Sequence, residues 1–207
     1  MNNLTVQGIQ DIFNHRKPGT VGRHKFFSVL IPLVEKDGEL HVLYEIRAKN
    51  LNRQPGEVCF PGGAIEEDET PLACARRETC EELGLTKNQV EVLSKAGTLY
   101  TVSNFTMYSY IGVIRGEIHP SEDEVDSTFL VPLRYLMENP PEMHFMEMLP
   151  KVGDDFPYDK IDFQNGYKWR KGKSEIPIYL YEDKIIWGVT ARVTNAFIRV
   201  LKEAECK

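Results

Sequence analysis

Three glutamates stand close together near residue 80: Glu78, Glu81 and Glu82. On an α-helix, residues three and four apart share one face, so these carboxylates would project together within one turn. Like charges at this spacing cost an isolated helix roughly 0.2–0.5 kcal/mol per pair. A hard divalent cation such as Mg²⁺, which prefers oxygen ligands, would turn that repulsion into attraction. A solvated acidic face is the alternative, and the residues upstream of the cluster favour a metal site.

The glutamates lie on a segment with clear helix start and stop signals. Thr70 suits the N-cap, and Pro71 suits the first helical position because its missing amide hydrogen would be unpaired there anyway. Gly84 supplies the left-handed residue that commonly ends a helix. The spacing therefore predicts a helix from Pro71 to Leu83. Its inward-facing stripe would consist of Leu72, Ala75, Thr79 and Leu83.

From Gly63 the chain reads Gly, five residues, Glu69, seven residues and then Arg-Glu-Thr-Cys-Glu-Glu-Leu-Gly-Leu. This string resembles the Nudix box, GX5EX7REUXEEXGU, and departs from it at Thr79, where an apolar residue is expected. The resemblance implies a loop-helix-loop that binds Mg²⁺ or Mn²⁺ against a pyrophosphate. It also implies the α/β class of fold, a Nudix α/β/α sandwich with a mixed β-sheet between helices.

The resemblance also implies roles for individual residues. Glu78 and Glu82 would be the principal metal ligands, with Glu81 assisting directly or through water and the backbone carbonyl of Gly63 as a further ligand. A second pair, Glu69 and Arg77, would form an ion pair that fixes the loop to the helix.

The resemblance also implies that a water molecule attacks one phosphorus of the pyrophosphate and that a base takes the proton of this water. In Nudix enzymes the base is a glutamate of the box or of a later loop. Glu124 is the first candidate, Glu81 the second and Glu122 the third; Glu78 completes the carboxylates expected in the catalytic centre. Glu124 stands in an acidic run that a solvated loop would explain equally well.

The residues before the box resemble the extended motif LLTXR(S/A)X3RX3GX3FPGG of coenzyme A pyrophosphatases. Arg47, Ala48, Gly56 and Phe60 to Gly63 are in register, whereas Tyr44 and Glu45 replace the second Leu and the Thr. Asn52 stands at the second Arg position, with Arg53 one place later. The stretch from Ile186 to Ala191 also resembles the same subfamily. The implied reaction is the Mg²⁺-dependent hydrolysis of coenzyme A or its derivatives to 3′,5′-ADP and 4′-phosphopantetheine.

The substrate would need cations for its phosphates, because Arg and Lys bind phosphate through charge-assisted hydrogen bonds. Arg47, Lys49 and Arg53 are the candidates, and Phe60 completes the expected substrate-binding set. The shifted Arg53 keeps open a Nudix hydrolase of another nucleoside diphosphate derivative, such as ADP-ribose or NADH. A catalytically silent nucleotide-binding domain is the third alternative, and the intact glutamates argue against it.

These residues must be positioned by one domain, expected over residues 21–207, with an N-terminal helix within residues 1–20 packed on it. Asp37-Gly38 predicts a hairpin between strands at 25–34 and 40–47. Further strands are expected at 90–99, 106–114, 127–132 and 178–181, and a final helix at 190–204. The stretch 139–175, dense in Pro, Gly, Asp and Lys, predicts a surface excursion.

Composition excludes several classes of protein. The 207 residues carry a net charge of -6, which argues against a nucleic-acid-binding surface. No apolar run approaches the roughly 18–20 residues of a membrane span, and the N-terminus lacks a secretory signal. A cytoplasmic protein with a small nucleotide substrate is expected, and the sequence leaves a homodimer open. The four cysteines show no CxxC pair and predict neither a disulfide framework nor a zinc site: Cys59, Cys74, Cys80 and Cys206.

Overall fold

The computed structural model describes residues 4–163 and 166–205. Residues 1–3, 164–165 and 206–207, which include Cys206, lie outside this description. The elements in chain order are α1 (Val6–Asn14), β1 (Lys25–Lys36), β2 (Glu39–Arg47), β3 (Val58–Cys59), β4 (Gly62–Ala64), α2 (Pro71–Leu83), the 3₁₀ turn η1 (Lys87–Gln89), β5 (Val90–Tyr100), β6 (Phe105–Ile114), β7 (Val125–Pro132), α3 (Leu133–Glu138), β8 (Glu142–Met148), β9 (Gly172–Tyr181), β10 (Lys184–Ile186) and α4 (Gly188–Glu205).

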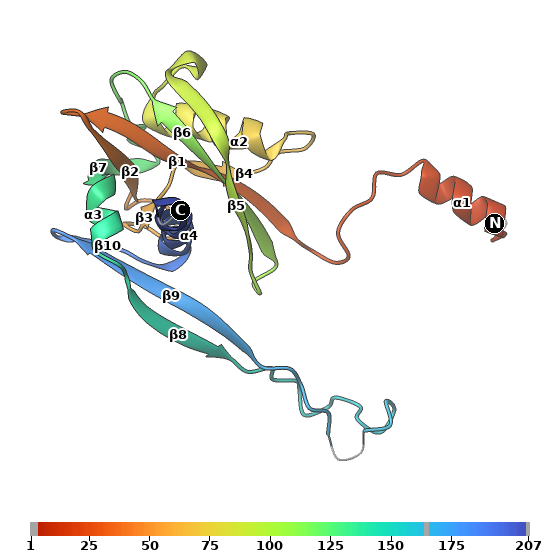
Figure 1. Cartoon of the computed structure of the whole chain (residues 1–207). Coiled ribbons are helices and arrows are strands. Elements are labelled where there is room, and N and C mark those ends of the chain that lie inside the picture. Colours follow the sequence, from red (N-terminus) through yellow and green to blue (C-terminus); the bar gives the residue numbers. More distant parts are fainter. Residues whose placement is uncertain (1–3, 164–165, 206–207) are drawn as a thin grey trace.

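The central sheet is mixed, as the sequence predicts. Its strand order is β3-β2-β1-β6-β5, with β4 also pairing with β1 and β7 with β2. The long strand β1 runs parallel to β6 and antiparallel to β2 and β4. Figure 1 shows β1 crossing the middle of the domain, where it joins both halves of the sheet. The smaller sheet, β10-β9-β8, is separate from it.

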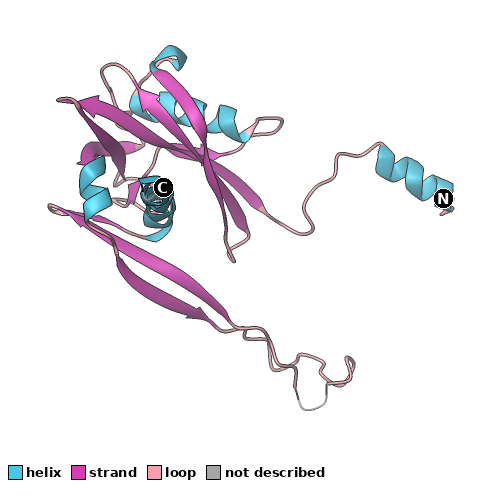
Figure 2. Ribbon diagram, viewed as in Figure 1, coloured by secondary structure: helices cyan, strands magenta, loops and turns pink. Residues whose placement is uncertain are grey.

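Alternate residues of β1 face two different layers of helices. Val29, Ile31 and Leu33 pack in one core with residues of α3 and α4, whereas Leu30 packs in a second core with residues of α2. This is the period-two alternation of a strand that is buried on both faces. The predicted α/β/α sandwich is therefore confirmed, with the helices visible on either side of the sheet in Figure 2.

The element predictions hold where the turn and cap signals are strong. Asp37 and Gly38 both have positive φ, 53° and 79°, the conformation of a tight hairpin turn with the twist of the flanking strands. The excursion at 139–175 differs from the expectation because its two ends are paired strands. β8 pairs in full with residues 172–178 of β9, forming a ribbon that projects from the domain (Figure 1). β9 therefore begins at Gly172, six residues before the predicted strand.

The N-terminal helix is not packed on the domain as predicted. None of the residues of α1 is buried, and Figure 1 shows the helix at the end of an extended linker. The linker contains Pro18 and Gly19, and its Val21 is fully exposed, so the linker supplies no apolar contact that would offset the entropy of docking this short helix. One exposed ion pair, between Lys17 Nζ and Asp68 Oδ1 at 2.8 Å, links the linker to the domain.

In the part of the chain that the structure describes, no helix combines the length and the apolar character needed to cross a membrane.

The approach of β4 to β1 depends on a glycine. Gly62 is paired with Val29 and has a φ of 154°. A Cβ at this position would lie 2.7 Å from Val29 Cα and would overlap the Ser28 carbonyl oxygen. Both neighbouring atoms belong to the backbone of a buried strand, which cannot move aside cheaply.

Replacing Gly62 with Ala should therefore destabilise the fold by about 2–4 kcal/mol, because overpacking and an unfavourable φ add together. Urea denaturation followed by circular dichroism measures the change in unfolding free energy. Gly19→Ala is the matched control, because its Cβ would enter open space and its φ is ordinary. A loss of stability in Gly62→Ala no larger than in the control would contradict this account.

Candidate active site

The predicted loop-helix-loop is present, and α2 spans the predicted residues. The Thr70 side chain accepts a hydrogen bond from the Ala73 amide at 3.2 Å, and Gly84 is left-handed with a φ of 64°. Ser28 Oγ on β1 donates to the Pro71 carbonyl at 2.6 Å, which fixes the start of the helix on the sheet. Thr79, the departure from the box, is buried and donates to the Ala75 carbonyl at 2.6 Å. Its hydroxyl is therefore satisfied within the helix.

Arg77 ties the loop to the helix through the ion pair that the resemblance implies. Its Nε and Nη2 donate to the two oxygens of Glu69 at 2.9 and 3.0 Å, a bidentate arrangement. Its Nη1 lies 3.0 Å from both Glu78 Oε1 and Glu81 Oε2. Arg77 lowers the pKa of the Glu69 carboxyl chiefly through its hydrogen bond. One guanidinium thus contacts three carboxylates, one in the loop before the helix and two in the second half of the helix.

Glu82 is a buried carboxyl directed at the loop. Only 4% of its surface is exposed, and Oε2 accepts a hydrogen bond from the Gly62 amide at 2.7 Å. Burial raises its pKa to about 8, with further increases from the charges of Glu78 and Glu124, against the lowering effects of the Gly62 amide and Arg47. The positively charged and hydrogen-bonding groups of the protein alone therefore do not keep this buried carboxyl ionised at its ordinary pKa.

Glu78 lies against the backbone of Gly63. A Cβ on Gly63 would overlap the Glu78 carboxylate, so only glycine allows this approach. Burial is the largest cause that raises the pKa of Glu78, and Glu81 and Glu124 add to it, while Arg77 opposes the rise. Glu78 and Glu82, one helix turn apart, thus both lie close to other negatively charged side chains.

Among the described residues, no three His, Cys, Asp or Glu side chains form a ready-made metal site. The residues nevertheless fit Mg²⁺ or Mn²⁺. Mg²⁺ usually takes one or two carboxylates and completes its shell with water and substrate phosphate oxygens. Glu78 and Glu82 would supply the carboxylates, and the backbone carbonyl of Gly63, whose residue lies against Glu78, would be the further ligand that the resemblance implies. Burial, and after it repulsion from neighbouring glutamates, raises the pKa of both carboxyls, and a divalent cation here would offset both effects.

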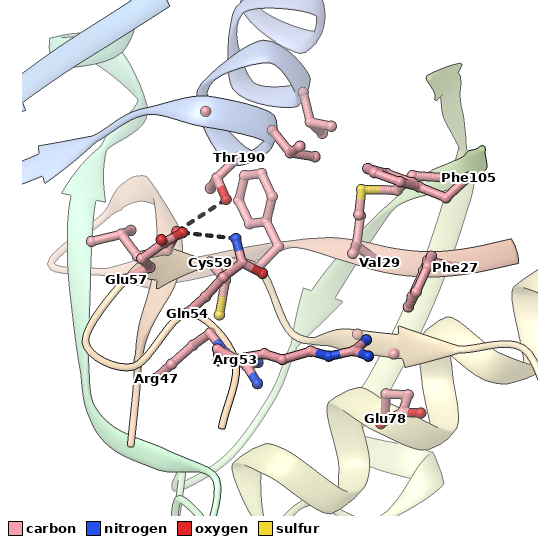
Figure 3. Close-up of a pocket in the computed structure, with 18 of the residues that line it drawn as sticks. Phe27, Val29, Arg47, Arg53, Gln54, Glu57, Cys59, Glu78, Phe105 and Thr190 are labelled. Carbon is pink, nitrogen blue, oxygen red and sulfur yellow. Dashed lines mark hydrogen bonds between the residues drawn. The ribbon is translucent and has the colours of Figure 1, made fainter. Parts of the chain in front are cut away.

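These groups line one cleft of about 830 Å³ (Figure 3). It brings together most of the residues singled out in the sequence: Arg47, Arg53, Phe60, Gly63, Glu78, Glu82 and Glu124. Arg47 and Arg53 lie next to each other on the loop side, with Glu78 across from them. The opposite wall is largely apolar and comes from β1, β6 and α4: Phe27, Val29, Phe105, Met107, Val189 and Val193.

The floor of the cleft connects the loop to the last helix. Phe60 is buried and stacks on Tyr44 with ring centroids 4.9 Å apart. The Tyr44 hydroxyl is 3.1 Å from Thr194 Oγ1, and Thr190 Oγ1 donates to the Val58 carbonyl at 3.0 Å. Phe60 therefore serves the packing of the cleft wall as much as any contact with substrate.

Three candidates lie elsewhere. Lys49 and Glu122 are exposed and do not line the cleft. Glu81 is also outside its lining, with its carboxylate paired to Arg77 and 58% exposed. Glu81 faces away because it lies about 100° around the helix from Glu82. Glu78 and Glu82, which are four residues apart, share the inward face.

Lys25 and Trp187, which were not among the predicted site residues, also line the cleft. Nothing in the local pattern distinguishes Lys25 from an ordinary surface residue, whereas Trp187 lies in the stretch from Ile186 to Ala191 that resembles the subfamily. Glu45 is a different case, because it is a fully buried acid on β2. The sequence did contain a signal for it, because Glu45 shares one face of the predicted strand with the apolar Leu43 and with Arg47.

With the geometry in place, the comparisons with known proteins define the class. The model of the NUDIX domain family matches residues 24–151, which is more than half of the chain. The chain therefore belongs to the Nudix hydrolase family. The crystal structure of a MutT/nudix family protein from Enterococcus faecalis has the same fold. It aligns over 96% of this chain and 70% of its own, with a TM-score of 0.55 and 14% identity.

The chain is also similar to two curated members of that family. It is 36% identical over 135 residues to the peroxisomal coenzyme A diphosphatase NUDT7 of Mus musculus, which covers 63% of this chain and 56% of the mouse protein. It is 29% identical over 174 residues to the uncharacterized Nudix hydrolase NudL of Escherichia fergusonii, which covers 82% of this chain and 79% of that protein. The match thus spans little more than half the length of the mouse relative.

The burial of Glu82 makes the stability of the metal-free protein depend on pH. The pKa of this carboxyl is about 8 in the folded state against 4.5 for an ordinary glutamate. The folded state therefore binds the extra proton between these values. The free energy of unfolding should fall as the pH rises across this window, by a few kcal/mol at most. Replacing Glu82 with Gln should reduce the slope.

Urea denaturation in EDTA, at several pH values across the window, measures both proteins. Adding MgCl₂ should stabilise the wild type most at the alkaline end. Parallel pH profiles for wild type and Glu82→Gln would contradict the assignment of the slope to this residue.

Proposed function

We propose that this protein is a Mg²⁺- or Mn²⁺-dependent pyrophosphatase that hydrolyses coenzyme A or its derivatives to 3′,5′-ADP and 4′-phosphopantetheine. One observation carries the proposal: a single cleft joins crowded carboxylates and two arginines to a long apolar wall. Coenzyme A has the matching order of groups. Its pyrophosphate lies between a nucleotide with an additional 3′-phosphate and the extended pantetheine chain.

The arginines support this substrate class. Asn52 stands at the motif position of the second arginine, yet Arg53 lines the cleft beside Arg47. The one-residue shift therefore still leaves two guanidinium groups facing the cleft. Two cations next to a metal-binding centre suit a substrate with a phosphate in addition to its pyrophosphate.

The apolar wall supports the same class from the other side. Phe27, Val29, Phe105 and Met107 form a surface that a long, weakly polar chain would cover. The mouse relative is named for coenzyme A diphosphatase activity, which agrees with this arrangement. A homodimer and a cytoplasmic location remain predictions from the sequence.

In the proposed reaction the chain's own residues hold the substrate and the metal site. Glu78, Glu82 and the Gly63 carbonyl would hold the cation, with Arg77 orienting Glu78. The bound cation supplies neutralisation of the charge that develops on the pyrophosphate oxygens. Arg47 and Arg53 bind phosphate oxygens and keep the scissile bond in the cleft.

Glu124 is the proposed base. It lines the cleft, and its charge raises the pKa of both Glu78 and Glu82, so it lies close to the centre. The backbone of its turn is fixed, because the Glu124 carbonyl accepts from the Ala48 amide at 2.9 Å. Glu124 would take the proton from a water whose oxygen bonds to one phosphorus as the bridging P–O bond breaks. The leaving phosphate keeps the bond electrons.

A product analysis tests the function. Purified protein with MgCl₂ is offered coenzyme A, acetyl-coenzyme A, ADP-ribose and NADH in parallel, with an EDTA control. We expect 3′,5′-ADP from the coenzyme A substrates faster than any product from the other two. Glu82→Gln should lower turnover by orders of magnitude. Preference for ADP-ribose or NADH would overturn the substrate class, and no metal-dependent turnover at all would favour a silent binding domain.

Arg47 and Lys49 form a matched pair for substrate binding, because they are two residues apart and only Arg47 lines the cleft. Arg47→Ala should raise KM for coenzyme A about 10- to 100-fold, the effect of losing a charge-assisted hydrogen bond. Lys49→Ala should change KM by less than about twofold. Steady-state kinetics measures both, and equal effects of the two substitutions would contradict the placement of the phosphate beside Arg47.

A further inference from the structure

Glu45 is a buried carboxyl that the proposed reaction does not use. It lies on β2 with 1% of its surface exposed. Its Oε1 has no hydrogen-bond partner among the described residues. Its Oε2 accepts a hydrogen bond from the Cys59 thiol at 3.8 Å. A buried acid with one unpaired oxygen is costly, so its presence on this strand calls for a compensating role.

The strand register places Glu45 beside two residues of the cleft. Cys59 on β3 is its direct register partner, and Arg47 follows two residues later on β2. Residues i and i+2 of a strand share a face, so Glu45 and Arg47 point to the same side of the sheet. Glu45 therefore lies behind the wall of the cleft, whereas Arg47 and Cys59 line it.

A chain of interactions runs outward from Glu45. The Cys59 thiol donates to Glu45, and Figure 3 shows the Cys59 sulfur beside the Arg47 side chain. Arg47 Nε in turn donates to the Arg53 carbonyl at 3.4 Å. The Arg47 side chain thus lies between the thiol on the inner side and the loop backbone on the outer side.

The charges around Glu45 are consistent with a neutral carboxyl that accepts the hydrogen of the Cys59 thiol. Burial is the largest cause that raises the pKa of Glu45, and Glu82 and Glu124 raise it further, while Cys59 and Arg47 lower it. A neutral acid still accepts the thiol hydrogen. With its hydrogen donated to Glu45, the Cys59 sulfur can act only as an acceptor toward a donor on the Arg47 side chain.

We propose that Glu45 is a positioning residue that, through Cys59, holds the Arg47 guanidinium at the cleft wall where a substrate phosphate binds. This inference rests on the proposed function only in that Arg47 receives a phosphate, and it does not depend on which nucleotide is the substrate. An arginine fixed before binding loses less side-chain entropy when the phosphate arrives. The role should therefore affect KM more than kcat.

Paired substitutions separate the loss of the hydrogen bonds that position Arg47 from a change in side-chain packing. Glu45→Leu removes the acceptor and Cys59→Val removes the thiol link, whereas Glu45→Gln and Cys59→Ser keep an acceptor and a donor in place. We expect the first two to raise KM about fivefold with kcat within twofold, and the second two to stay near wild type. Ile46→Val, on the opposite face of the same strand, is the control and should change neither constant.

A double-mutant cycle with Arg47→Ala provides the decisive kinetic test. If Glu45 acts through Arg47, Glu45→Leu and Cys59→Val should have no further effect on KM once Arg47 is removed. The substrate is whichever member of the nucleotide panel the wild type turns over. Additive effects in the Arg47→Ala background would overturn the proposal, as would an unchanged KM in both Glu45→Leu and Cys59→Val.

A ligand-free measurement keeps this test separate from the proposed function. The Nε–Hε signal of Arg47, assigned in NMR spectra by its loss in Arg47→Lys, reports the mobility of the side chain. We expect an ordered signal in wild type and Glu45→Gln, and a mobile one in Glu45→Leu and Cys59→Val. Equal mobility in all four would overturn the positioning role. An ordered Arg47 in a protein without turnover would instead overturn the function alone.

Discussion

The hydrogen bond from the Gly62 amide to the buried carboxylate of Glu82 joins the parts of this molecule that must meet. Gly62 belongs to β4, which pairs with β1, and Glu82 belongs to α2, which packs on one face of the same strand. One interaction thus connects sheet, loop and helix at the centre of the cleft. It depends on a residue without a side chain, because β4 comes too close to β1 for any Cβ.

The same constraint explains the electrostatics of the site. A loop this close to the sheet excludes water from Glu82 and partly from Glu78, which makes both carboxylates harder to ionise. Arg77 offsets part of that charge from the outer side of the helix. The inner side is left with surplus negative charge facing the cleft, and a divalent cation can compensate it. The fold and the proposed chemistry therefore depend on the same feature, a loop packed closely against a strand that is buried on both faces.

The parts of this arrangement that follow from local chemistry could be predicted from the sequence. Thr70, Pro71 and Gly84 determine the limits of α2, and Asp37-Gly38 determines the hairpin, because each acts through its immediate neighbours. The choice among Glu78, Glu81 and Glu82 required the orientation of the helix, which only tertiary packing supplies. Of the ribbon, only the end of β9 was predicted; β8 was missed because its residues are mostly exposed and lack the apolar alternation of a buried strand. Lys49 and Arg53 looked equivalent until the loop placed one in the cleft and left the other outside it.

The parallel pairing of β1 with β6 has a consequence for how the protein acquires its site. Lys25 pairs with Phe105, so the two strands meet only after the chain between them has folded back, and that chain contains the whole loop-helix-loop. Parallel pairing over such a sequence separation is slow compared with the formation of a helix or hairpin. The helix with its glutamates can therefore form early, but the cleft wall with Phe105 and Met107 closes late. On the ribosome, the residues of the acidic helix would emerge well before β6, the strand that completes the wall of the cleft.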